Sequence, residues 1–95
     1  MAKIFWTQEA FNNLEQAISF AEANYPEAWA ENLKATVREI QDKIEKNKIL
    51  PRRKGRVKGT EEIDFITLPF FLVVRVNLQG EFEFIALLHK HQKYP

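Results

Sequence analysis

The sequence predicts an α+β fold in which an antiparallel helical hairpin packs on one face of a β-sheet. Residues 8–46 carry apolar side chains at intervals of three and four, which is the period of helices with one buried face. Residues 62–89 contain short runs of aromatic and β-branched residues separated by turn residues, which is typical of strands. A chain of 95 residues suits one domain with one core, so we expect residues 1–95 to fold as a single unit.

The amino-terminal part of the chain predicts a short strand and a first helix. The apolar run at residues 3–6 favours a strand. Thr7, which follows it, is a good helix N-cap because its hydroxyl can accept a hydrogen bond from a free backbone N–H. We expect the helix at residues 8–24, since Pro26 disfavours helical geometry in the residue before it.

A second helix is expected at residues 26–46. Pro26 suits the first position of a helix, and apolar residues then recur at helical spacing from Trp29 to Ile44. Because the connection to the first helix is short, the two helices should run antiparallel. Their shared apolar stripe would then cover one face of the sheet.

The last third of the chain predicts a three-stranded antiparallel meander at residues 62–68, 70–77 and 81–89. Pro69 cannot donate a hydrogen bond to a neighbouring strand and therefore marks the end of the first run. The middle run is apolar almost throughout, so we expect a central strand that is covered on both faces. The connection to the last run contains Asn and Gly, which favour a hairpin turn.

The composition excludes several classes of site. The sequence contains no cysteine, which excludes disulfides, thiol catalysis and zinc–thiolate sites. It contains no apolar run of about eighteen residues and no signal-peptide pattern, so we expect a cytoplasmic protein without membrane association. We expect no cofactor and no metal site, because His89 and His91 have no third ligand near them in the sequence.

A strongly basic loop is expected at residues 47–60, where proline and glycine punctuate the charges. The bases between positions 46 and 58, with no acid among them, are Lys46, Lys48, Arg52, Arg53, Lys54, Arg56 and Lys58. Such a cluster suits an anionic partner, either a nucleic acid or an acidic protein, and a solvated linker has the same composition. A basic nucleic-acid-binding domain is therefore one functional hypothesis, although no base-reading motif supports it.

Three segments resemble the ParE branch of the RelE/ParE toxin superfamily in their residues, order and spacing. They are Gly55-Arg56-Val57-Lys58-Gly59-Thr60-Glu61-Glu62-Ile63, Leu68-Pro69-Phe70-Phe71-Leu72-Val73-Val74-Arg75-Val76 and Leu87-Leu88-His89-Lys90-His91-Gln92-Lys93-Tyr94-Pro95. Members of this superfamily are toxins of bacterial type II toxin–antitoxin modules, each held inactive by an antitoxin expressed with it. The resemblance therefore implies a toxin, and for the ParE branch it implies inhibition of DNA gyrase by binding.

A RelE-like ribosome-dependent mRNA endoribonuclease is the alternative that the superfamily implies. In that branch an Arg of the central strand stabilises the charge that develops on the phosphate. Phe71 stands at the matching position here, so the resemblance favours a binding inhibitor over an enzyme. If the chain is a ribonuclease, its candidate catalytic residues are Arg56, Arg75, His89 and Tyr94. For Arg75, a structural bond to the backbone or to a carboxylate is the other interpretation.

The resemblance also implies two binding surfaces. We expect the tail at residues 90–95 to bury little and to help bind the target, together with the end of the last strand. The candidate target-binding residues are His89, His91, Gln92 and Tyr94. We expect the antitoxin in an apolar groove between the helical hairpin and the sheet, with its acidic residues on the basic loop. The candidate antitoxin-binding residues are Arg52, Arg53, Arg56 and Lys58. A homodimer and a hetero-oligomer with the antitoxin are both compatible with this family.

Overall fold

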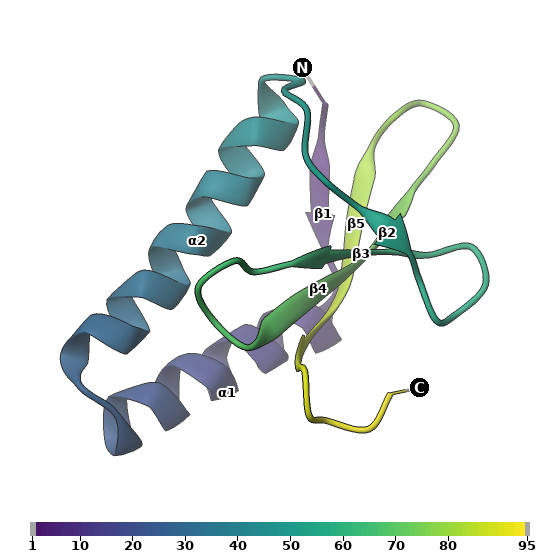
Figure 1. Cartoon of the computed structure of the whole chain (residues 1–95). Helices are drawn as coiled ribbons and strands as arrows, with labels where there is room; N and C mark the ends of the chain where they lie inside the picture. Colours follow the sequence, from purple (N-terminus) through teal and green to yellow (C-terminus); the bar gives the residue numbers. More distant parts are fainter. Residues whose placement is uncertain (1, 95) are drawn as a thin grey trace.

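The fold consists of two helices and a five-stranded mixed sheet (Figure 1). The computed structural model describes residues 2–94. In chain order the elements are β1 (Ile4–Trp6), α1 (Gln8–Asn24), α2 (Glu27–Glu45), β2 (Arg53–Lys54), β3 (Glu61–Asp64), β4 (Phe70–Val76) and β5 (Phe82–His89). The predicted α+β class, with a helical hairpin on one face of a sheet, is confirmed. Neither of these helices is both long and apolar enough to cross a membrane.

The sheet has the strand order β1-β5-β4-β3-β2. Strands β3, β4 and β5 form the antiparallel meander that the sequence predicted. β1 runs parallel to β5, so that Ile4 lies opposite Phe82 and Trp6 lies opposite Phe84. β2 pairs with β3 at the other edge. The sequence predicted neither edge pairing, because strands of two or three residues carry too little pattern to identify a distant partner.

Hydrogen bonds of Thr7, the N-cap, and Asn13, in the second turn, join the start of α1 to β5. Thr7 Oγ1 accepts a hydrogen bond from the N–H of Ala10 at 3.1 Å and donates to the carbonyl of Ile85 at 3.0 Å. Asn13 Oδ1 accepts the N–H of Leu87 at 3.1 Å. The pairing of β4 with β5 skips Ile85, so a β-bulge places its carbonyl within reach of the helix cap.

We call the face of the sheet that the helices cover the helix face. Leu72 and Val74 of β4 belong to its core, and both are fully buried. The buried residues that α2 adds are Ala30, Leu33, Val37, Ile40 and Ile44. From α1 only Ala10 and Ala21 are buried to the same degree. The larger part of the helical cover therefore comes from α2.

We call the opposite side of the sheet the loop face. Phe71 and Val73, which alternate with the helix-face residues of β4, are also 0% exposed. Together with Ala86 and Leu88 they form a second, smaller apolar cluster. Both helices lie on the other side (Figure 1), so the cover of this cluster comes from the basic loop and the tail. The central strand is thus buried on both faces, as the sequence predicted.

The strand predicted at residues 62–68 is too long, because β3 ends at Asp64. The chain then turns, with Phe65 and Leu68 buried and Ile66 96% exposed. Two residues three positions apart lie on opposite sides of an extended strand. The turn allows Phe65 and Leu68 to enter the helix-face core together, and this burial favours the turn over a longer strand.

The loop expected at residues 47–60 contains β2 and a tight turn. Gly55 donates its N–H to the carbonyl of Thr60 at 2.9 Å. A Cβ atom at Gly55 would lie 2.1 Å from Thr60 Oγ1, so only glycine permits this close approach. The bounds of the other helices and strands agree with the predicted ones to within one residue.

Candidate functional site

The candidate site lies on the loop face, around the buried ring of Phe71. The guanidinium group of Arg56 lies over this ring, 4.7 Å from its centroid, and that of Arg53 lies 5.6 Å from it. Tyr94 of the tail meets the same ring edge-on, with 6.3 Å between the two centroids. The basic loop and the tail therefore converge on one residue of β4.

A buried carboxylate holds the two arginines in place. The side chain of Glu62 is 0% exposed and forms ion pairs with Arg53 and Arg56. Glu62 Oε2 accepts the backbone N–H of Arg56 at 2.9 Å. Glu62 Oε1 accepts no well-aligned hydrogen bond from residues 2–94, so it depends on the two guanidinium charges. A carboxylate out of water is stable only when it is paired in this way.

Asp64 binds the outer side of Arg53. Two hydrogen bonds of 3.0 and 3.1 Å join the guanidinium group to the two carboxylate oxygens. These bonds lower the pKa of the Asp64 carboxyl and raise the pKa of Arg53, against a smaller opposing effect of burial on each. Because Glu62 binds the same guanidinium group, Arg53 has little free charge to offer an incoming phosphate.

The surroundings of Tyr94 make its phenol a weaker acid. Partial burial raises the pKa of Tyr94, the nearby charges of Glu62 and Glu9 raise it further, and Arg56 opposes them. A phenol that acts as a general acid needs the opposite shift, because it must release its proton near neutral pH. The ring also packs against the loop-face cluster, so the expectation that the tail buries little is wrong for Tyr94. The last residue of the predicted tail, Pro95, lies outside the described residues.

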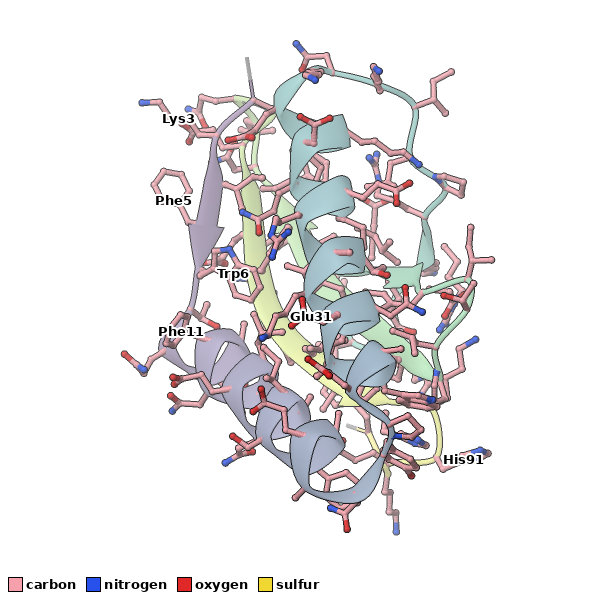
Figure 2. The ribbon with its side chains drawn as sticks, turned by 90° about the vertical axis from the view of Figure 1, so that its left-hand side faces the viewer. Lys3, Phe5, Trp6, Phe11, Glu31 and His91 are labelled. Atoms are coloured by element: carbon pink, nitrogen blue, oxygen red, sulfur yellow. The ribbon has the colours of Figure 1, made fainter. Side chains whose placement is uncertain are left out.

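The two histidines lie away from the candidate site. His89 ends β5 and points to the helix face, where its ring meets that of Phe70 at 5.4 Å between centroids. The N–H of His91 donates to His89 Nδ1 at 3.1 Å, and Gln92 Oε1 accepts the N–H of His89 at 3.3 Å. His91 projects from the surface (Figure 2). Within residues 2–94, no group of three or more His, Asp or Glu side chains is placed to hold a metal ion.

Arg75 lies on the loop face of β4 but is bound to another partner. Its Nη1 donates to Glu83 Oε1 of β5 at 3.1 Å. Arg75 therefore forms a structural bond to a carboxylate, which was the alternative to a catalytic role in the sequence analysis. Of the four candidate catalytic residues, the structure brings together Arg56 and Tyr94, and it separates them from Arg75 and His89.

The basic loop carries less free charge than its sequence indicates. Arg52 pairs with Glu61 of β3 at 3.2 Å, and the next two arginines are paired as described above. The bases between positions 46 and 58 that pair with no other described residue are Lys48, Lys54 and Lys58. Sequence reasoning missed Glu62 and its neighbours. The available signal was the group of acids at positions 61, 62 and 64, directly after the loop.

An apolar groove of about 480 Å³ lies between α2 and the neighbouring edge of the sheet. Thr36 and Ile40 of α2 line one side of it, and Leu50, Phe65 and Ile66 line the other. Ile66 is 96% exposed and therefore stands at the rim. The groove lies where the sequence analysis expected a segment of the antitoxin.

The sequence matches no protein-family model. It is 26% identical over 95 residues to a protein of Sinorhizobium fredii (strain NBRC 101917 / NGR234) named "Putative toxin Y4kP". This similarity covers 98% of the present chain and 93% of that protein.

Two solved structures resemble this one along most of its length. A chain from the chromosomal ParDE TA system of P. aeruginosa has a TM-score of 0.75 and 18% sequence identity, and the match covers 94% of this chain and 96% of that chain. The isolated E. coli RelE toxin has a TM-score of 0.60 and 12% identity, with 98% of this chain and 88% of that chain covered. Identities this low establish the architecture rather than the activity. The agreement confirms the resemblance found in the sequence: the chain has the fold of the RelE/ParE toxin superfamily.

Proposed function

We propose that the chain is the toxin of a bacterial type II toxin–antitoxin module, and that it inhibits DNA gyrase in the cytoplasm by binding. The full-length similarity to a protein named as a toxin supports the first part. The higher TM-score with the ParDE chain, 0.75 against 0.60 for RelE, supports the ParE-like alternative. A cognate antitoxin would hold the toxin inactive.

The observation that carries this proposal is the apolar ring at the centre of the loop face. Cleavage of a phosphodiester by side chains needs a cation fixed against the developing charge, and loss of one such group typically lowers the rate by about a hundredfold or more. Phe71 fills that position, Arg53 is bound by two carboxylates, and the raised pKa of Tyr94 makes its phenol a weaker proton donor. Inhibition by binding needs only a surface that binds one state of the target better than another.

We assign target binding to the tail and the end of β5. His91 and Gln92 are exposed, and hydrogen bonds around His89 hold this part of the tail in one shape. A surface that is ordered before binding loses less conformational entropy when the target is bound. Tyr94 would anchor the same surface through its contact with Phe71.

The purified chain should inhibit the supercoiling activity of gyrase, and this assay tests the proposal. The double variant His91→Ala, Gln92→Ala should require a concentration at least about tenfold higher for the same inhibition, because both side chains belong to the assigned surface. Gln79→Ala, in the exposed turn between β4 and β5, is the matched control and should inhibit like the wild type. Equal inhibition by all three proteins would contradict the assignment of the tail.

We place the antitoxin in the groove beside α2, as an amphipathic segment that becomes ordered on binding. Ile66→Asp should weaken the complex about tenfold or more, since it sets a charge at the apolar rim without opening the core. Leu78→Asp is the control, because Leu78 is 103% exposed and lies in a different turn. Lys58→Glu should weaken the complex and reduce its sensitivity to salt if acidic antitoxin residues reach the loop. If Ile66→Asp and Lys58→Glu bind the antitoxin with wild-type affinity, the proposal that the antitoxin binds this surface is wrong.

A RelE-like endoribonuclease is the second candidate, and one observation favours it. Arg56 lies over Phe71 beside Tyr94, and its side chain is 39% exposed, so a phosphate could reach it. Codon-specific cleavage of ribosome-bound mRNA, lost in Arg56→Ala and accompanied by no effect on supercoiling, would reject the gyrase proposal in favour of this one. No effect in either assay would point to an inactive toxin or to another target.

A further inference from the structure

We propose that the free edge of β1 is a dimer interface, on which a second copy of this chain adds its own β1 to form one continuous sheet. β1 is the last strand of the sheet and has β5 on one side only. The groove and the basic loop lie at the opposite edge, beside β2 and β3. The proposed dimer therefore leaves both of those surfaces accessible, and it does not depend on the proposed function.

The backbone of β1 presents hydrogen-bonding groups that no other strand within residues 2–94 uses. On its inner side, the carbonyl of Lys3 accepts the N–H of Phe82 at 2.8 Å, and the N–H of Thr7 reaches a carbonyl of β5 at 3.0 Å. Backbone groups of alternate residues point to the same side of a strand. The N–H and C=O groups of Ile4 and Trp6 therefore point to the free edge, where they form a template for another strand.

Two exposed aromatic rings flank this edge. Phe5 is 51% exposed, and Phe11 in the first turn of α1 is 47% exposed. Figure 2 shows both rings projecting from the same side of the molecule, whereas Trp6 points inward. Trp6 meets the ring of Phe84 in the core, with 4.9 Å between centroids. Core packing accounts for the apolar side chain of Trp6. It does not account for that of Phe5, because exposed strand edges usually carry charged residues.

The edge is complementary to itself, which points to a second copy rather than to an unrelated strand. In an antiparallel pair with its twofold axis at Phe5, Ile4 of each copy faces Trp6 of the other, and all the outward backbone groups of these residues find partners. The two Phe5 side chains become directly opposed neighbours in the pair type where side chains are closest. Lys3 of each copy approaches the first helical turn of the other copy, where Glu9 has the opposite charge.

A cross-linking experiment tests this geometry directly, because the sequence contains no cysteine. Opposed residues of this kind have Cα atoms about 4.5 Å apart, which is within the range of about 4.4–6.8 Å that a disulfide spans. Phe5→Cys should therefore oxidise to a covalent dimer of twice 11.2 kDa. Phe20→Cys, at a ring that is 58% exposed in α1, is the matched control and should cross-link at least about tenfold more slowly. Equal rates for the two variants would overturn the proposal.

Sedimentation equilibrium tests the association without a covalent bond. The edge is short, so the wild-type dimer should form only at high concentration, and Phe5→Lys should weaken it by about a hundredfold through the loss of the central ring and the repulsion of two lysines. Phe20→Lys should associate like the wild type, and both variants should melt near the wild-type temperature because their rings are more than half exposed. A wild-type mass of 11.2 kDa at every concentration would overturn the proposal. If the wild-type chain is monomeric and Phe5→Lys weakens its complex with the antitoxin, the edge of β1 binds an antitoxin strand instead.

Discussion

The centre of β4 is fully buried on both faces of the sheet, but different interactions cover the two faces. On the helix face, Leu72 of β4 lies in an apolar core that α2 covers. On the loop face, Phe71 is covered by two guanidinium groups, the buried Glu62 behind them and the ring of Tyr94. Apolar contacts are not directional and tolerate changes of similar volume. A buried group of charges is stable only when each of its members is present.

This difference indicates how a small fold can keep its core while its surface changes. The helix face holds the larger apolar core, which supplies most of the burial that stabilises the fold. The loop face is covered by a connecting segment and a chain end, which generally have lower local stability than packed helices. The candidate catalytic, target-binding and antitoxin-binding residues therefore lie mostly on segments that can vary without loss of the fold.

The largest effect on stability should come from the helix face. Leu33→Ala removes a side chain that is 1% exposed, so it should lower the free energy of unfolding by about 2–5 kcal/mol. Leu78→Ala, at a fully exposed leucine, should change it by less than about 0.5 kcal/mol. Denaturant unfolding monitored by circular dichroism measures both values. Similar values for the two variants would show that α2 is not the main cover of the sheet.

A smaller effect is expected for the buried charge of the loop face. Glu62→Gln keeps the shape of the side chain but leaves Arg53 and Arg56 without a counter-charge, and should lower the free energy of unfolding by about 1–3 kcal/mol. The two arginines are partly exposed and can turn towards water, which keeps the loss below that of Leu33→Ala. Glu61→Gln breaks an exposed pair and should cost less than about 1 kcal/mol. A loss for Glu62→Gln no larger than that for Glu61→Gln would mean that the loop face does not depend on its buried charge.

The ring of Tyr94 should matter more than its hydroxyl group. Tyr94→Ala uncovers Phe71 and should lower the free energy of unfolding by about 1–2 kcal/mol. Tyr94→Phe keeps the ring and should leave stability nearly unchanged. In the supercoiling assay, the same two variants test whether the hydroxyl group of Tyr94 contacts the target. If Tyr94 only packs, Tyr94→Phe should inhibit gyrase like the wild type, and a complete loss of inhibition would give the hydroxyl group a direct role in the target contact.

The smallest effect should be the pH dependence contributed by Asp64. Its hydrogen bonds from Arg53 lower the pKa of the carboxyl in the folded state, so the unfolded chain binds this proton more tightly. This contribution to stability is complete above the unfolded value of about 4, and it is lost as the pH falls through the folded value. Because the pair is partly exposed, the contribution should stay below about 1 kcal/mol. Denaturant unfolding at neutral pH and below pH 4 should show a smaller decrease for Asp64→Asn than for the wild type, and identical decreases would contradict this assignment.

The sequence predicted more of the fold than of the candidate site. Apolar periodicity predicted the helices of the hairpin, and β-branched and aromatic runs predicted the meander. The prediction failed at residues 65–68, where a strand pattern gave way to a turn that buries two side chains on the same face. Of the site, the resemblance singled out Arg56, Phe71 and Tyr94, which the structure brings together, but it also included His89 and Arg75, which lie elsewhere.

The sequence by itself determined the elements of this protein, because helix and strand periodicity, caps and turns depend on neighbours within a few positions. Only the tertiary structure decided the pairing of β1 with β5 and the burial of Glu62. It also decided that the three arginines of the basic loop, among its six bases, would be bound by acids of β3. The charge that a surface offers to a partner depends on which side chains lie within a few ångströms in space, and a linear sequence does not contain those distances.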